Sequence, residues 1–159
     1  MDRKLLPLAL LLLLPPVSRG AGDAALDRAT LRGLKAVSVV VDVLDPEVQK
    51  LGVTRAALID SMLAHLQKGG VRIDPTATEF VGLRLNAVRG GRGPYAVSLS
   101  LGLYQPVLLS RNKDVRTSTQ TWEVETVLVA DPKGLLAACS ESAGELADGF
   151  AIAFRAVNQ

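Results

Sequence analysis

The middle of the chain alternates apolar and other residues with a period of two, as β-strands with one buried face do. Leucine, valine and alanine occupy the odd positions of 81–87, and apolar residues again occupy the odd positions from Tyr95 to Leu103. The glycine-rich loop 89–94 joins these two predicted strands, and Gln105-Pro106 indicates a bulge or a place where the strand leaves the ladder. Residues 111–114 look like a turn, so a return strand is predicted over about 116–129, with Trp122 facing the core.

The flanking segments predict one further long strand, a short strand and two helices. Residues 36–44 form a valine-rich run that predicts a strand in the interior of the sheet, ended by Asp45-Pro46. Thr54 is expected to cap a helix that runs to about Lys68, with its apolar residues in one stripe and Gly69-Gly70 as its stop. Residues 71–73 predict a short strand, and 134–157 an amphipathic helix that docks on the sheet.

In order, these elements predict an α+β fold, β-α-β-β-β-β-α. We expect a two-layer sandwich in which two helices cover one face of a mostly antiparallel sheet of four to five strands. The other face is the candidate interaction face, with Tyr104 as its aromatic contact, and it is expected to present Arg84, Asn86, Ser98, Ser100, Tyr104, Thr119, Thr121, Glu123 and Glu125. On this face lies a small-residue strip, made of Ala96, Ser98, Ser100 and Gly102, which either lets a partner approach closely or packs beneath a covering segment of the same chain.

The first twenty residues read as an export signal. A basic start is followed by an apolar run from Leu5 to Val17 and then by small residues, and the run is shorter than the ~20 residues of a membrane-spanning helix. Cleavage after Gly20 and cleavage after Gly22 both fit. The expected organisation is a signal peptide over 1–20, a mobile lead-in over 21–34 and a single domain over 35–159, with no integral membrane segment after the signal is removed.

The charge of the mature chain argues against a nucleic-acid partner. The chain has 18 basic and 16 acidic residues, and residues 1–20 hold three of the basic and one of the acidic ones. Removing them leaves a net charge of zero, whereas a nucleic-acid-binding protein normally has a basic face. Cys139 is the only cysteine, so an internal disulfide is excluded. It lies far beyond the leader, so a lipid-anchored amino-terminal cysteine is excluded as well.

No catalytic, cofactor-binding or metal-binding set of residues is predicted. His65 is the only histidine and has no second ligand near it in the sequence. Cys139 has the spacing of a buried helix position, where a thiol is inert. Glu123 and Glu125 lie two residues apart on one strand, about 7 Å, and a solvated face explains them better than a carboxylate pair does. We expect a protein that is not an enzyme.

The stretch from Ser98 to Val124 and the closing amphipathic helix resemble small exported bacterial proteins of unassigned role. More remotely, the order of elements resembles the α+β domain shared by the TolB amino-terminal region, the curli-secretion lipoproteins and the lipoprotein activators of penicillin-binding proteins. This chain differs from the lipoprotein members because it lacks their anchoring cysteine. The resemblance implies a non-catalytic envelope protein that works by docking.

The leading hypothesis is therefore a periplasmic or secreted interaction or assembly module, which binds an envelope protein or associates with itself. Two alternatives stay open. One is a carrier or sensor of a small ligand, held between the small-residue strip 96–102 and the loop from Arg89 to Pro94. The other, less favoured, is a hydrolase that uses Glu123, Glu125 or His65.

Overall fold

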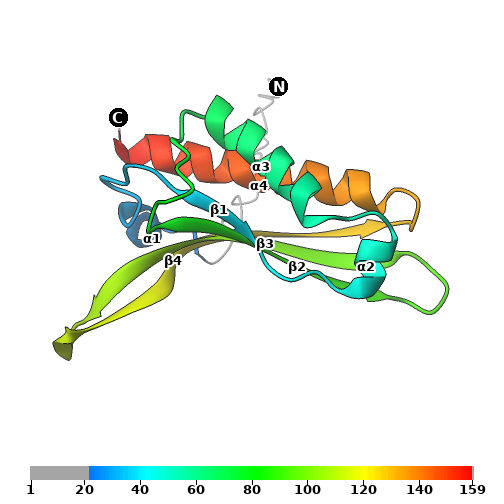
Figure 1. Cartoon of the computed structure of the whole chain (residues 1–159), viewed down its shortest axis with the longest axis horizontal. Helices are drawn as coiled ribbons and strands as arrows, with labels where there is room; N and C mark the ends of the chain where they lie inside the picture. Colours follow the sequence, from blue (N-terminus) through cyan, green and yellow to red (C-terminus); the bar gives the residue numbers. More distant parts are fainter. Residues whose placement is uncertain (1–21, 159) are drawn as a thin grey trace, which may run out of the picture.

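One sheet and the helices on one of its faces make up the fold (Figure 1). The computed structural model describes residues 22–158, so the predicted signal peptide lies outside the described residues, apart from Gly22 at the second cleavage position. The strands are β1 (Ser38–Val41), β2 (Phe80–Arg89), β3 (Tyr95–Leu109) and β4 (Asn112–Ala130). The helices are α1 (Ala25–Ala29), α2 (Pro46–Lys50), α3 (Arg55–Lys68) and α4 (Leu135–Asn158).

The sheet is mixed, and its spatial order β1-β2-β3-β4 follows the chain. β1 pairs with β2 in parallel, and the two other pairings are antiparallel. The predicted α+β class is confirmed, but the strand expected over 71–73 is only an isolated bridge between Val37 and Ile73. The Val71 N–H donates to the Leu66 carbonyl at 3.0 Å, at the end of α3, so this segment closes the helix before it can pair as a strand.

β1 is an edge strand, although its valine-rich sequence predicts an interior one. The strand ends at Val41, and Val43 is 86% exposed. Asp45 then caps α2, because its carboxylate accepts from the Glu47 N–H at 2.7 Å, and Pro46 takes the first helical position. The strand thus ends before the Asp-Pro pair that the sequence predicts as its end, and the pair starts a helix instead.

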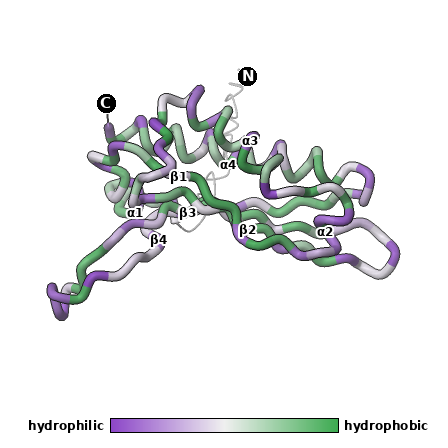
Figure 2. The backbone as a smooth tube through the Cα atoms, viewed as in Figure 1, coloured by the Kyte–Doolittle hydropathy of each residue, from purple (hydrophilic) through white to green (hydrophobic). Residues whose placement is uncertain are grey.

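β3 and β4 form a long hairpin that extends beyond the rest of the sheet (Figure 1). Hydrophilic residues gather at its tip and in the loop between β2 and β3 (Figure 2). The pairing shifts between Leu103 and Tyr104: Leu103 pairs with Trp122 and Tyr104 with Gln120, so Thr121 is the extra residue of a bulge. The sequence predicts a bulge at Gln105-Pro106 of β3, whereas the pairing shifts just before these residues and the extra residue belongs to β4.

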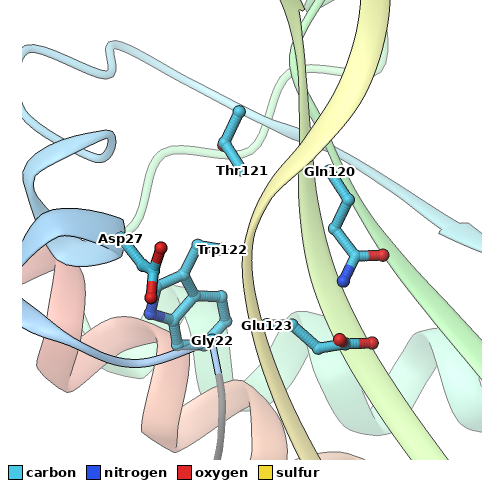
Figure 3. Close-up of a pocket in the computed structure, with 6 residues that line it drawn as sticks. All are labelled: Gly22, Asp27, Gln120, Thr121, Trp122 and Glu123. Carbon is cyan, nitrogen blue, oxygen red and sulfur yellow. The ribbon is translucent and has the colours of Figure 1, made fainter.

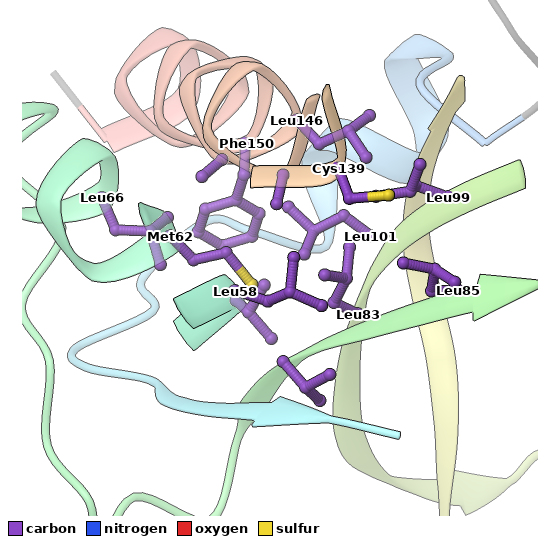
Figure 4. Close-up of a cluster of buried hydrophobic side chains, with 14 of the residues drawn as sticks. Leu58, Met62, Leu66, Leu83, Leu85, Leu99, Leu101, Cys139, Leu146 and Phe150 are labelled. Carbon is purple, nitrogen blue, oxygen red and sulfur yellow. The ribbon is translucent and has the colours of Figure 1, made fainter. Parts of the chain in front are cut away.

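The core lies between the sheet and the two long helices (Figure 4). Leu83 and Leu101 of the sheet are fully buried, as are Met62 of α3 and Phe150 of α4. The Trp122 and Phe150 rings meet edge to face, with centroids 5.2 Å apart. The predicted inward alternation of β2 and β3 is confirmed. Every leucine and valine that is expected to face the core between Val81 and Leu103 is buried, and Ala87, on the same side of β2, is partly buried.

Both long helices begin and end close to their predicted bounds. Thr54 caps α3 by accepting from the Ala57 N–H at 3.2 Å, and the helix ends at Lys68 before the two glycines. α4 runs one residue past its predicted end, and its stripe from Leu135 to Phe150 faces the core. Among the helices within residues 22–158, none combines the length and the apolar character that crossing a membrane requires.

Small residues let α3 and α4 approach each other closely. A Cβ added at Gly144 would lie 2.7 Å from Nε2 of His65, and one added at Gly69 would lie 2.3 Å from the Ala151 Cβ. The Ser61 hydroxyl donates across the interface to the Ser140 carbonyl at 2.6 Å. The two helices therefore form one rigid layer on the sheet.

The segment before β1, for which the sequence predicts a mobile lead-in, contacts the sheet and α4. Leu31 is fully buried, and the Asp23 carboxylate accepts from the Trp122 indole N–H at 2.9 Å. The Glu123 N–H donates to the Gly22 carbonyl at 3.2 Å, so the lead-in pairs with part of the outer edge of β4. Arg28 of α1 forms an ion pair with Asp23, which raises the pKa of the guanidinium.

Candidate functional site

The candidate site is the face of the sheet that lies opposite α3 and α4. Within residues 22–158 no helical layer covers this face (Figure 1). We call it the open face. The register of β2, β3 and β4 arranges its residues in five rows, each written here in the order β2, β3, β4: Phe80-Tyr104-Gln120, Gly82-Gly102-Glu123, Arg84-Ser100-Glu125, Asn86-Ser98-Val127 and Val88-Ala96-Val129.

An aromatic pair occupies one end of the open face. The rings of Phe80 and Tyr104 stack with centroids 4.8 Å apart and planes within 5° of parallel. Gly82 leaves room for this stack, since a Cβ there would lie 3.0 Å from the Tyr104 ring. Both rings are half-buried, so a flat apolar surface stays accessible. Tyr104, the predicted aromatic contact, lies on the open face as expected.

A chain of polar contacts crosses the sheet beside the aromatic pair. The Tyr104 hydroxyl donates to Oε1 of Gln120 at 2.8 Å and accepts from Nη2 of Arg84 at 3.2 Å. Nε of Arg84 lies 3.6 Å from Oδ2 of Asp42, just past the end of β1. Gly102 has a steric role, because a Cβ there would lie 2.8 Å from the Gln120 side chain. Contacts from β2 and β4 thus hold the Tyr104 hydroxyl, and Asp42 in turn contacts Arg84.

Next to this network is a shallow hollow of about 250 Å³, lined by Asp42, Phe80, Gly82, Leu83, Arg84 and Tyr104. Its volume is below the range of roughly 300–1,000 Å³ that is usual for sites of drug-sized ligands. A larger hollow of about 660 Å³ lies away from the open face, where β4 connects to α4. The loop from Arg89 to Pro94 is the one that the small-ligand hypothesis uses. In this loop the Arg89 guanidinium donates to the Gly93 carbonyl at 3.3 Å, so the loop is closed by a contact within itself.

The centre of the open face is low and polar. Ser98 and Ser100 are half-buried, Asn86 is exposed, and Arg84 and Glu125 stand on either side of Ser100. Of the four residues of the small-residue strip, Ala96, Ser98, Ser100 and Gly102, only Gly102 is buried, beneath the Gln120 side chain. Of the two alternatives that the sequence leaves open for this strip, the structure therefore supports the uncovered one.

Three exposed valines lie at the other end of the open face. Val88 and Val129 lie in the outermost row and are 71% and 70% exposed, and Val127 in the neighbouring row is 72% exposed. Ala96 lies between Val88 and Val129 and is also exposed. Sequence reasoning does not name these valines as contacts. The signal that could have revealed them is the run from Val127 to Val129, which is apolar on both faces of one strand.

Two of the nine predicted face residues depart from the expected arrangement because of the bulge at Thr121. Beyond it Gln120 takes the outward position opposite Tyr104, so Thr119 pairs with Gln105 on the other side of the hairpin. The prediction that Thr119 shares the open face is wrong for this reason. Thr121 is half-buried, and its carbonyl accepts from the Thr30 hydroxyl at 3.4 Å. The seven other predicted residues lie together on the open face.

A third hollow, of about 230 Å³, lies where the lead-in meets β4 (Figure 3). It is lined by Gly22, Asp27, Gln120, Thr121, Trp122 and Glu123. Its wall contains the point at which the lead-in pairs with β4, beside the buried Trp122. Gln120 and Glu123 belong to the open face, so this hollow lies between the lead-in and the β4 side of that face.

The remaining chemically capable side chains are dispersed over the fold. Nδ1 of His65 lies 2.9 Å from Oδ2 of Asp148 on the helix layer, whereas Glu123 and Glu125 lie on the opposite side of the sheet. Cys139 is fully buried, and burial raises the pKa of its thiol to about 11. Within residues 22–158, no three histidine, cysteine or acidic side chains cluster closely enough to hold a metal ion.

Comparison with known proteins gives distant structural likenesses. No family model matches the chain, and no curated protein does. A PelC L103M dodecamer from Paraburkholderia phytofirmans is 16% identical, with a TM-score of 0.42, and the match covers 72% of this chain and 84% of that one. A minor lipoprotein from Acinetobacter baumannii is 8% identical, with a TM-score of 0.25, over 76% of this chain and 91% of that one. At these values neither likeness supports an inference about function.

Proposed function

We propose that this protein is a non-catalytic, exported interaction module of a bacterial envelope, which acts by docking a protein partner on the open face. Export is supported by the leader pattern of residues 1–20. Docking is supported by the structure of the face itself. It combines a fixed aromatic pair, a low polar centre and an exposed apolar end on three paired strands.

The exposed valines are the observation that carries this proposal. Isolated apolar side chains are common on protein surfaces, but Val88, Val127 and Val129 occupy two adjacent rows of one rigid sheet. Fully burying a valine contributes about 1.5 kcal/mol or more, so the three together offer a partner about 4 kcal/mol of favourable burial. The neighbouring serine and charged side chains supply the polar contacts that a specific interface needs.

Site-specific photocrosslinking in the native envelope tests the proposal. A photoreactive amino acid at Ser100 or at Val127 is expected to form adducts with a discrete protein partner. The matched control is the same amino acid at Glu141, which is exposed on α4 in the helix layer. Adducts from Ser100 and Val127 without adducts from Glu141 would support docking through the open face. Efficient adducts from Glu141 alone, or from none of the three, would refute it.

A further inference from the structure

The arrangement of charge on the open face points to a particular partner. Arg84 and Glu125 belong to the same row, one strand to each side of Ser100. With strands about 4.8 Å apart, their Cα atoms lie about 10 Å from each other, at equal distances from the central strand β3. The face therefore carries opposite charges at mirror positions about β3.

We propose that the open face binds the open face of a second copy of this chain, with a two-fold axis running along β3 between the two sheets. This rests on the proposed docking function and names its partner. A two-fold axis along the central strand exchanges β2 and β4, so it places Arg84 of each copy opposite Glu125 of the other copy. Two equivalent intermolecular ion pairs result from one pair of residues.

The apolar end of the face has the same symmetry. Val88 on β2 and Val129 on β4 flank Ala96, so the same axis places Val88 of one copy against Val129 of the other, and this contact too occurs twice. Both side chains are about 70% exposed in the single chain, so their contact removes apolar surface from water. One symmetry operation accounts for the charged row and the apolar row together.

The small residues of β3 lie on this axis, where the two sheets come closest. Ala96, Ser98 and Ser100 meet their own equivalents there, and short side chains keep the central strands within the ~10 Å spacing of packed sheets. Ser98 and Ser100 also supply hydroxyls that can donate and accept across the axis. In these three rows the small residue of β3 lies between larger residues of β2 and β4, which is the shape that this pairing requires. Tyr104 lies on the same axis, in the aromatic row at the end of the face.

The contacts within one chain leave the charged pair available. Arg84 and Asp42 are 49% and 59% exposed and 3.6 Å apart, a separation at which an exposed ion pair contributes little. Glu125 is exposed and forms no ion pair with another residue of 22–158. Arg84 also donates to the Tyr104 hydroxyl at 3.2 Å, in an exposed hydrogen bond. Moving the Arg84 guanidinium to Glu125 of the partner copy therefore exchanges two exposed contacts, with Asp42 and Tyr104, for a less solvated ion pair.

The size of the face sets the expected strength. Five rows spaced by two residues span about 27 Å along the strands, and three strands with their side chains span about 14 Å. The projected area, including the ends of the rows, is about 450 Å² for each copy, or about 900 Å² in total. This is below the roughly 1,600 Å² of a standard stable interface, so the dimer is expected to dissociate in the micromolar range or weaker.

Charge reversal followed by mixing tests the axis directly. Sedimentation velocity of the exported protein between about 1 µM and about 1 mM should show a monomer that becomes a dimer with rising concentration. In a dimer of Arg84→Glu, the introduced carboxylate of each copy lies opposite Glu125 of the other copy. In a dimer of Glu125→Arg, the introduced guanidinium of each copy lies opposite Arg84 of the other copy. Each variant should bind itself about tenfold or more weakly, because like charges then meet twice.

An equimolar mixture of the two variants is expected to recover dimerisation, because every charged contact in the mixed dimer is again between opposite charges. The matched control is the reversal of two exposed helix-layer charges, Arg55→Glu and Glu141→Arg, which should leave the wild-type association unchanged. Circular dichroism checks that each variant is folded, and all four substituted positions are exposed.

Three results would overturn the proposal: a monomer at every concentration, single variants that dimerise as the wild type does, or a mixture that recovers nothing. The second would assign the dimer to another surface, such as the exposed edge of β1 or β4. Failure of the proposed function is a separate outcome. A chain that stays monomeric but forms adducts with a different protein from Ser100 refutes self-association and leaves docking through the open face intact.

Discussion

Replacing Gly144 with alanine tests the close packing of α3 against α4. Two effects oppose each other in this substitution. Alanine in a helix interior is favoured over glycine by about 1 kcal/mol. The added Cβ, however, would lie 2.7, 2.9 and 3.1 Å from three atoms of the His65 ring, closer than carbon and nitrogen atoms pack. The ring must therefore move.

The geometry of His65 sets the magnitude of that cost. The side chain is 38% exposed, so the ring has a route towards solvent, and overpacking should cost towards the low end of the usual range, about 1–2 kcal/mol. The displaced ring also loses its contact with Asp148, worth about 0.5 kcal/mol for an exposed pair. Gly144→Ala should therefore lower the free energy of unfolding by about 1 kcal/mol in the wild type.

Removing the ring reverses the sign. In a His65→Ala background the three ring atoms nearest to the added Cβ are gone, so the same substitution should raise the free energy of unfolding by about 1 kcal/mol. The coupling between the two positions is then about 2 kcal/mol, measured as a double-mutant cycle by urea unfolding. Gly149→Ala in the same helix is the control, since its Cβ would have its nearest neighbour at 4.0 Å, and it should stabilise both backgrounds equally. Equal effects of Gly144→Ala in the two backgrounds would show that His65 does not lie over Gly144.

Three further predictions concern the core and the lead-in. Because burial raises the pKa of Cys139 from 9.0 to about 11, the thiol contributes stability that is fully present below pH 9 and is lost as the pH rises towards 11. The unfolding free energy should therefore fall less over this pH range in Cys139→Ala than in the wild type. Equal slopes in the two proteins would contradict the buried thiol. Asp23→Ala leaves the indole N–H of Trp122 without its acceptor and should destabilise the fold by about 1–3 kcal/mol in urea unfolding, whereas an unchanged midpoint would place the lead-in away from β4. Since the Gly22 carbonyl accepts from the Glu123 N–H, the mature chain is expected to begin at Ala21, and an intact mass that begins at Asp23 would refute this.

Local signals in the sequence were sufficient for the elements that depend on near neighbours. Thr54 and the glycines after Lys68 place α3 correctly, because caps and stops act within a few residues. The alternation around Leu83 and Leu101 identifies the buried side of the sheet, because every second side chain of a strand points the same way. The same alternation leads to seven of the nine predicted residues of the open face.

The remaining features depend on contacts between distant segments, which periodicity does not reveal. A valine-rich run such as 36–44 has the same pattern at the edge of a sheet as inside it, so the edge position of β1 follows only from the tertiary structure. The extra residue at Thr121 is defined by its partner strand, and it changes the side on which Thr119 lies. Likewise, only the structure shows that Asp23 accepts from Trp122, 99 residues away.

Adjacent residues of β3 face opposite ways, one into the core beneath the helices and one onto the open face, where we propose that a partner docks. Thiol labelling of Ser100→Cys and Leu101→Cys, each in a Cys139→Ala background, tests this directly. In dilute native protein the thiol introduced at position 100 should react far faster than the one at position 101, which is reached only through unfolding. Raising the concentration of the unlabelled wild-type chain should slow labelling at position 100 alone. Equal protection of both positions in the dilute protein would contradict the account.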